Sequence, residues 1–133
     1  MRTKSIMLVD DERETVTVMT DMLEKQGYAV HGFTDTEKAL AHAKDCKECG
    51  IIVSDIRMPG MNGFQLLRAL KKSRRDMKVV IMTAFEINKS EWKQVLPSTE
   101  VNQFLRKPVR MFQLAKVIEK CTSSDVVVAN VQS

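Results

Sequence analysis

The fold is decided by the stretch Ile51-Ile52-Val53-Ser54-Asp55, in which a short apolar run ends in a carboxylate. Apolar runs of this length are typical of strands that are buried on both faces of a sheet. Three further short apolar runs are each followed by a polar residue, which is a carboxylate only in the first of them. They are Ile6–Val9 before Asp10-Asp11, Val79–Met82 before Thr83, and Phe104-Leu105 before Lys107-Pro108.

Amphipathic stretches with helical spacing separate these runs. We predict a helix over residues 13–26 that Gly27 stops, a strand over Tyr28–Phe33, and a helix that Thr34 and Glu37 begin as a capping box. Later helices are predicted after the turn-rich segment Ile56–Gly63, around Ser90–Leu96, and from Met111. Five strand–helix alternations predict one parallel sheet with helices on both faces.

Polar side chains follow four of the five predicted strands. The carboxyl ends of parallel strands meet at one edge of a sheet, where ligands bind in such folds. The residues expected at this edge are Asp10, Asp11, Asp55, Thr83 and Lys107. Three carboxylates placed together repel one another unless a cation is near. Mg²⁺ prefers oxygen ligands, and Lys107 adds a second positive charge, so the set suits phosphoryl transfer to Asp55 as an acyl phosphate.

Composition limits the class of protein. The chain has 133 residues, 44% hydrophobic and 29% charged, with a net charge of +4, which is typical of one globular domain. The apolar runs are too short for a membrane span or a signal peptide, so a cytoplasmic location is expected. Basic residues concentrate in the second half of the chain, but no aromatic residues interleave with Lys71–Arg75. We therefore expect a solvated helix end there and no direct contact with nucleic acid.

The motifs resemble those of response-regulator receiver domains, the phosphoacceptors of two-component systems. The resemblance covers about residues 4–120. It rests on Val9-Asp10-Asp11-Glu12, Ser54–Gly63, Met82-Thr83-Ala84 and Lys107-Pro108, with 28 residues from Asp55 to Thr83 and 24 from Thr83 to Lys107. The resemblance implies a flavodoxin-like doubly wound sheet with the strand order 2-1-3-4-5. We accordingly predict a receiver domain over residues 1–121 and a tail or linker stub over 122–133.

The resemblance also implies a role for each site residue. Asp55 would accept the phosphoryl group, and Lys107 would pair with a phosphoryl oxygen. Mg²⁺ would bind Asp11, Asp55 and the backbone carbonyl of Arg57, with Asp10 acting largely through water. Thr83 would move toward the phosphoryl group while Phe104 turns inward, and the Lys107-Pro108 bond would be cis. The domain would catalyse only its own phosphorylation and dephosphorylation, and would not turn over an external substrate.

Partners follow from the same resemblance. The phosphodonor would be a histidine kinase or phosphotransfer protein. The output partner would meet the face made by the fourth helix, fifth strand and fifth helix, where Trp92 lies, and a homodimer could form on phosphorylation. Bulky Arg57 and Phe85 are expected to slow hydrolysis of the acyl phosphate, whereas small Ala84 leaves the donor's approach open.

Cys46-x-x-Cys49, with His42 one helical turn earlier, could bind zinc or act in redox chemistry. Since a second ligand pair is missing, and since the cysteines fall near a helix C-terminus where the dipole disfavours thiolate, we expect ordinary surface thiols. His31 is expected to be an ordinary strand residue. The role of these thiols and of the tail 122–133 stays open.

Two other classes of protein remain. A constitutive interaction module would keep the fold without using the phosphosite, but the complete set of acids, Thr83 and Lys107 argues against it. A phosphohydrolase would need an Asp-x-Asp motif after the first strand, and a flavin protein would need a phosphate loop there. Asp10-Asp11-Glu12 fits neither.

Overall fold

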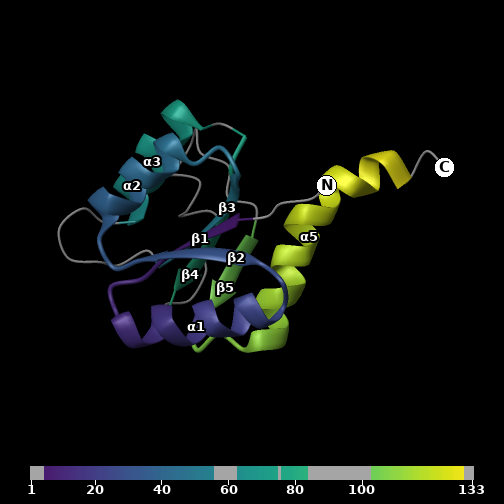
Figure 1. The fold of residues 1–133 in the computed structure, drawn as a ribbon, viewed down its shortest axis with the longest axis horizontal. Coiled ribbons are helices and arrows are strands. Elements are labelled where there is room, and N and C mark those ends of the chain that lie inside the picture. Colours follow the sequence, from purple (N-terminus) through teal and green to yellow (C-terminus); the bar gives the residue numbers. More distant parts are fainter. Residues whose placement is uncertain (1–4, 56–62, 75, 84–102, 131–133) are drawn as a thin grey trace.

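Five parallel strands form one sheet in the order β2-β1-β3-β4-β5, as predicted (Figure 1). The computed structural model describes residues 5–55, 63–74, 76–83 and 103–130. The strands are β1 (Ser5–Val9), β2 (Ala29–Phe33), β3 (Cys49–Asp55), β4 (Lys78–Thr83) and β5 (Gln103–Arg106). The order places β1 and β3 inside the sheet, so their carboxyl ends lie beside each other.

Four described helices cover the two faces of the sheet. They are α1 (Arg13–Lys25), α2 (Thr36–Asp45), α3 (Gly63–Ser73) and α5 (Met111–Asn130). In Figure 1, α2 and α3 lie on one side of the sheet, and α1 and α5 lie on the other. The predicted doubly wound arrangement is therefore confirmed. The predicted helix around Ser90–Leu96 lies outside the described residues.

Alternation along the strands divides the core into two layers. In β1, Met7 and Val9 pack with α2 and α3, whereas Ile6 and Leu8 pack with α1 and α5. All four side chains are fully buried. A strand covered by helices on both faces needs apolar residues at every position, which explains why these runs are continuous and do not alternate with polar residues.

Two glycines set the path into and along the edge strand. Gly27 has a φ of 98° directly after α1, a backbone conformation that favours glycine, and it ends the helix as predicted. Gly32 lies in β2 under α1, where an added Cβ would come within 2.5 Å of Val16 Cγ1. The close approach of α1 to the edge strand therefore requires a residue without a side chain at Gly32.

The start of α2 differs from the predicted capping box. Asp35, not Thr34, is the N-cap, and its carboxylate accepts hydrogen bonds from the backbone of Glu37 and Lys38. The helix begins one residue later than expected because the Asp35 side chain can reach both exposed N–H groups of the first turn.

The last helix continues beyond the predicted end of the receiver domain. The α5 backbone is helical through Asn130, so the proposed boundary at residue 121 falls within a helix. Figure 1 shows the C-terminal part of α5 extending away from the sheet. No helix in the described parts of the chain is long and apolar enough to cross a membrane.

Arg74 corrects the prediction that the basic run after α3 is only a solvated surface. Its side chain is 11% exposed, and its guanidinium donates to the backbone carbonyls of Ala43, Cys46 and Cys49 at 2.9, 2.7 and 2.8 Å. Arg74 therefore joins the end of α3 to the α2–β3 connection. The run of basic residues in the sequence shows where the charges lie but not where each side chain points, so this role of Arg74 could not be predicted from it.

Candidate functional site

The predicted acidic cluster forms at the carboxyl edge of the sheet. Asp10 follows β1 and is fully buried, Asp55 ends β3 and is 7% exposed, and Asp11 is exposed. Carboxylate oxygens from all three residues lie within 4.8 Å of one another. The adjacent positions of β1 and β3 in the sheet produce this convergence.

Lys107, which follows the edge strand β5, completes the cluster with a positive charge. Its ammonium donates to Asp10 Oδ2 at 2.7 Å and to Asp55 Oδ2 at 3.0 Å. One cation thus bridges two largely buried carboxylates that are 45 residues apart in the sequence. The Lys107-Pro108 bond is cis, as the resemblance implied.

The pKa values of Asp11 and Lys107 are both raised, each for a different reason. Burial and the neighbouring Asp10 carboxylate raise the pKa of Asp11. Burial alone would lower the pKa of Lys107, but its hydrogen bonds and ion pairs with Asp10 and Asp55 outweigh burial and raise it. The site therefore holds a firmly charged ammonium, and Asp11 favours a further positive charge.

Backbone hydrogen bonds hold the site residues in place. The Glu12 N–H donates to Asp10 Oδ1 at 2.9 Å, and the Lys107 N–H donates to the Thr83 carbonyl at 2.7 Å. The Ser54 hydroxyl donates to the Asp55 carbonyl at 2.8 Å. Sequence reasoning did not assign these supporting roles to Glu12 and Ser54, although both residues belong to the motifs that it identified.

The two predicted switch residues lie on neighbouring strands. Thr83 ends β4 and is 1% exposed, while Phe104 is half-buried on β5 and packs against the core beneath α2 and α3. The register places Phe104 opposite Ile81, two residues before Thr83. Arg57, Ala84, Phe85 and Trp92 lie outside the described residues.

The donor atoms of the cluster fit Mg²⁺. Three carboxylates offer hard oxygen ligands at one edge, which is the chemistry that this ion prefers. Their residue types do not fit a soft metal, because this cluster contains no sulfur or imidazole donor.

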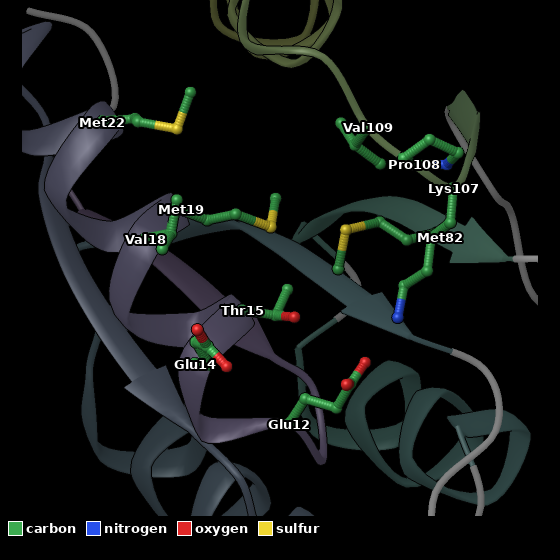
Figure 2. Close-up of a pocket in the computed structure, with 10 residues that line it drawn as sticks. All are labelled: Glu12, Glu14, Thr15, Val18, Met19, Met22, Met82, Lys107, Pro108 and Val109. Atoms are coloured by element: carbon green, nitrogen blue, oxygen red, sulfur yellow. The ribbon is translucent and has the colours of Figure 1, made fainter.

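An apolar cleft lies beside the acidic cluster, between α1 and the segment that follows β5 (Figure 2). Its volume is about 600 Å³, and its lining includes the methionines Met19, Met22 and Met82. In Figure 2 the Lys107 side chain runs past Met82, and its amino group points away from Pro108. The base of Lys107 therefore belongs to the cleft wall, while its charged end belongs to the acidic cluster.

Comparison with known proteins identifies the family. The model of the response regulator receiver domain matches residues 6–119. The phosphoglycerate transport system transcriptional regulatory protein PgtA of Salmonella typhimurium is 31% identical over 123 residues, covering 86% of this chain and 27% of PgtA. The sensor kinase CckA of Brucella abortus is 31% identical over 117 residues, covering 87% of this chain and 12% of CckA. The chain thus spans less than a third of either relative.

Solved structures agree with this family. A response regulator receiver domain protein from Clostridium thermocellum has a TM-score of 0.82 at 23% identity, covering 94% of this chain and 98% of that one. The chemotaxis protein CheY4 of Vibrio cholerae has a TM-score of 0.80 at 26% identity, covering 90% and 98%. Receiver domains are the phosphoacceptors of two-component signalling, and they typically bind Mg²⁺ at an acidic pocket. Sequence motifs, sheet order and site geometry therefore converge on one conclusion: the chain belongs to the receiver domains of two-component response regulators.

Proposed function

We propose that Asp55 accepts a phosphoryl group from the phosphohistidine of a histidine kinase or phosphotransfer protein in the cytoplasm. The observation that carries this proposal is the bridge made by Lys107, whose ammonium lies 3.0 Å from Asp55 Oδ2 and 2.7 Å from Asp10 Oδ2. A positive charge held against a carboxylate at the sheet edge is suited to stabilise the phosphoryl oxygens that would arrive there.

The transfer exchanges one bond to phosphorus for another. A carboxylate oxygen of Asp55 forms an O–P bond while the N–P bond to the donor histidine breaks, and the departing imidazole nitrogen keeps the electron pair and takes up a proton. The Asp55 side chain then changes from a charge of −1 to about −2. Lys107 can follow this change because its flexible side chain already lies between Asp10 and Asp55.

Mg²⁺ would be held by Asp11 and Asp55, by the Arg57 carbonyl that the family resemblance implies, and by Asp10 largely through water. When bound, the ion neutralises charge on the carboxylates and on the phosphoryl oxygens. Burial and the neighbouring carboxylates raise the pKa of Asp11, and a cation bound beside Asp11 would relieve this unfavourable charge, which supports the assignment. Asp10 is held toward the cluster by the Glu12 N–H and the Lys107 ammonium.

The same residues would catalyse hydrolysis of the acyl phosphate, so that the domain controls the lifetime of its own signal. Water would attack phosphorus, the O–P bond to Asp55 would break, and inorganic phosphate would leave. This self-catalysis does not turn over an external substrate.

The signal would pass through Thr83 and Phe104. Thr83 is buried beside the site, and its carbonyl accepts a hydrogen bond from the Lys107 N–H, so movement at Lys107 and at the end of β4 is connected. Phe104 would turn inward as Thr83 moves toward the phosphoryl group. The altered face would comprise the predicted fourth helix, β5 and α5, and would bind an output partner or a second copy of the chain.

Phosphodonor labelling tests the acceptor. We expect acetyl phosphate with Mg²⁺ to add the mass of one phosphoryl group to the wild type, and hydroxylamine to remove it as it does from acyl phosphates. Asp55→Asn should abolish labelling, whereas Asp21→Asn, at an exposed site on α1, should retain it. Labelling that persists in Asp55→Asn would overturn the assignment. A wild type that is folded but never labelled would instead favour a constitutive interaction module.

Fluorescence tests the switch. The Phe104→Trp substitution would report the inward movement as a change in emission after phosphodonor treatment, with the wild-type signal of Trp92 as background. We expect the added Thr83→Ala substitution to remove most of that change while labelling of Asp55 persists. An unchanged emission response in the Thr83→Ala protein would contradict the coupling.

A further inference from the structure

A second cluster of metal-binding side chains lies away from the phosphoacceptor edge. It comprises His31 on β2, His42 in the last turn of α2, Cys46 at the C-cap of α2, and Cys49 at the start of β3. One ligand atom from each residue lies within 4.8 Å of all the others. We propose that these four residues bind one Zn²⁺ ion.

This cluster corrects the prediction that Cys46 and Cys49 are surface thiols without a second ligand pair. Cys49 is fully buried, and the two histidines supply the missing pair. His31 lies opposite Met7 in the β1–β2 register, and Met7 faces the core layer beneath α2. The strand therefore turns His31 toward His42. The spacing of residues in the sequence does not reveal this contact, because it depends on how β2 pairs with β1.

One separation in the cluster matches that of ligands sharing one tetrahedral ion, and the others lie within a short distance of it. With Zn–S of about 2.3 Å and Zn–N of about 2.0 Å, a sulfur and a nitrogen ligand lie roughly 3.5 Å apart, and two sulfurs lie about 3.8 Å apart. Cys49 Sγ is 3.7 Å from His42 Nε2, close to the expected value. Since no pair exceeds 4.8 Å, the widest has to close by at most about 1 Å to reach the tetrahedral separation of two sulfurs.

The aromatic rings around the cluster restrict the position of His42. Its ring centroid lies 4.5 Å from that of His31 and 5.1 Å from that of Phe33, with interplanar angles of 37° and 45°. His31, His42 and Cys46 are partly exposed, so an ion can enter from solvent, while Cys49 forms the buried base of the site.

The backbone that carries the cysteines is held in place before any ion binds. The Cys49 N–H donates to the Cys46 carbonyl at 3.3 Å, and the Cys46 N–H donates to the His42 carbonyl at 2.8 Å. Arg74 donates to the carbonyls of both cysteines and of Ala43. These hydrogen bonds fix the backbone from which Cys46 and Cys49 project, so little of the chain has to become ordered when an ion binds.

The ligand types select a borderline-soft ion over Mg²⁺. Two thiolates and two neutral imidazoles form the set typical of structural zinc sites, and the charges of two thiolates and Zn²⁺ sum to zero. Burial lowers the pKa of His42, which keeps its imidazole neutral, and burial raises the pKa of the Cys49 thiol to about 12. Binding thus forms two Zn–S and two Zn–N bonds and releases the two thiol protons to solvent.

The site is remote from the proposed phosphoacceptor, on which it does not depend. Cys49 and Asp55 are the first and last residues of β3, and this extended strand separates them by roughly 20 Å. The two ends of β3 therefore offer sulfur and nitrogen donors at one site and oxygen donors at the other.

Competitive zinc titration tests the proposal on the full chain. The protein would be reduced with a non-thiol reductant, stripped of metal, and titrated with Zn²⁺ against a chromophoric chelator of known affinity. Millimolar Mg²⁺ would be present throughout to occupy the acidic cluster. We expect one Zn²⁺ per chain, and at least a hundredfold weaker binding for Cys46→Ser and for His31→Gln. The control is Cys121→Ser, which removes a cysteine from the opposite core layer and should leave zinc binding unchanged.

Co²⁺ provides a readout that needs no variant. The wild type should give the intense visible bands of a tetrahedral ion together with a thiolate charge-transfer band. The proposal is overturned if the reduced protein fails to compete with the chelator, if Mg²⁺ displaces the zinc, or if Cys46→Ser folds and retains full affinity. A Co²⁺ spectrum with only weak octahedral bands would also overturn it, and so would a wild type whose cysteines form a disulfide and bind no zinc after reduction.

Discussion

Replacing Lys107 by methionine isolates the role of its charge in the folded state. Methionine is unbranched and similar in length, so the substitution removes the ammonium while keeping much of the side-chain volume in the cleft wall. Asp10, Asp11 and Asp55 would then share one edge without their bridging cation. We expect a large loss of stability in the absence of Mg²⁺.

The magnitude follows from the two ion pairs. At an effective dielectric constant of 20, separations of 2.7 and 3.0 Å give about 6 and about 5.5 kcal/mol of attraction before desolvation is subtracted. Breaking a buried ion pair costs about 3–5 kcal/mol in net terms, and Lys107 retains 21% side-chain exposure. We therefore expect the lower end of that range, about 3 kcal/mol, and a fall of about 10 °C in the midpoint of thermal unfolding.

Urea unfolding at neutral pH with a chelator present would measure this loss. The matched control is Lys25→Met, which breaks a 3.3 Å pair with Asp21 whose side chains are 75% and 65% exposed, and which should cost under about 0.5 kcal/mol. A loss below about 1 kcal/mol for Lys107→Met would show that the Lys107 ammonium does not stabilise the fold by bridging Asp10 and Asp55.

Lys107→Met should also change the affinity for Mg²⁺, and here the substitution is expected to strengthen an interaction. Lys107 and the proposed Mg²⁺ compensate the same carboxylates, so removing one favours binding of the other. Calorimetric titration should show Mg²⁺ binding about tenfold more tightly to Lys107→Met than to the wild type, equivalent to about 1.4 kcal/mol. Unchanged or weaker binding would mean that the ammonium and the ion do not compete for the same negative charge.

Three further changes test the fold in ways that urea unfolding can measure. Asp35→Ala should cost about 1 kcal/mol because it removes the α2 cap, and Thr34→Ala should cost clearly less; equal costs would contradict the assignment of the cap. Gly32→Ala should cost about 1 to 3 kcal/mol because its methyl group would collide with Val16, and a neutral result would show that α1 moves away freely. Asp76→Asn tests pH dependence: the hydrogen bond from Arg74 lowers the pKa of Asp76 below 3.8, so its contribution is present above that pH and is lost as the pH falls through the lowered pKa. The wild type should thus be more stable than Asp76→Asn at pH 7, and a gap that stays constant down to about pH 2 would exclude this linkage.

The acidic edge could be predicted from sequence because the parallel sheet determines it. Once Ile6–Val9 and Ile51–Val53 are recognised as buried strands, the residues that follow them must meet at one edge, and Asp10 and Asp55 do. Lys107 was predictable on the same ground, although it lies 52 residues beyond Asp55. The apolar runs and the parallel direction of the strands carry this information without any knowledge of side-chain contacts.

The histidine–cysteine cluster and the role of Arg74 could not be predicted in that way. His31 reaches His42 from a different element, across a strand register that short-range spacing does not encode. Arg74 lies in a run of basic residues whose charge suggested solvent, but its guanidinium turns back onto the α2–β3 connection. The choice between Thr34 and Asp35 as the helix cap was equally local, since both residue types cap helices well and only the backbone path selects one.

The position of β2 at the edge of the sheet has a kinetic consequence. Interior strands exchange their amide protons only when the whole domain opens, whereas an edge strand can detach at a lower free-energy cost. Of the four proposed zinc ligands, His31 is the one on that strand. Detachment of β2 would take one ligand away while α2 and the start of β3 keep the other three. The residence time of an ion would then be governed by the local opening of β2, and amide exchange along Ala29–Phe33 would slow when the ion is bound.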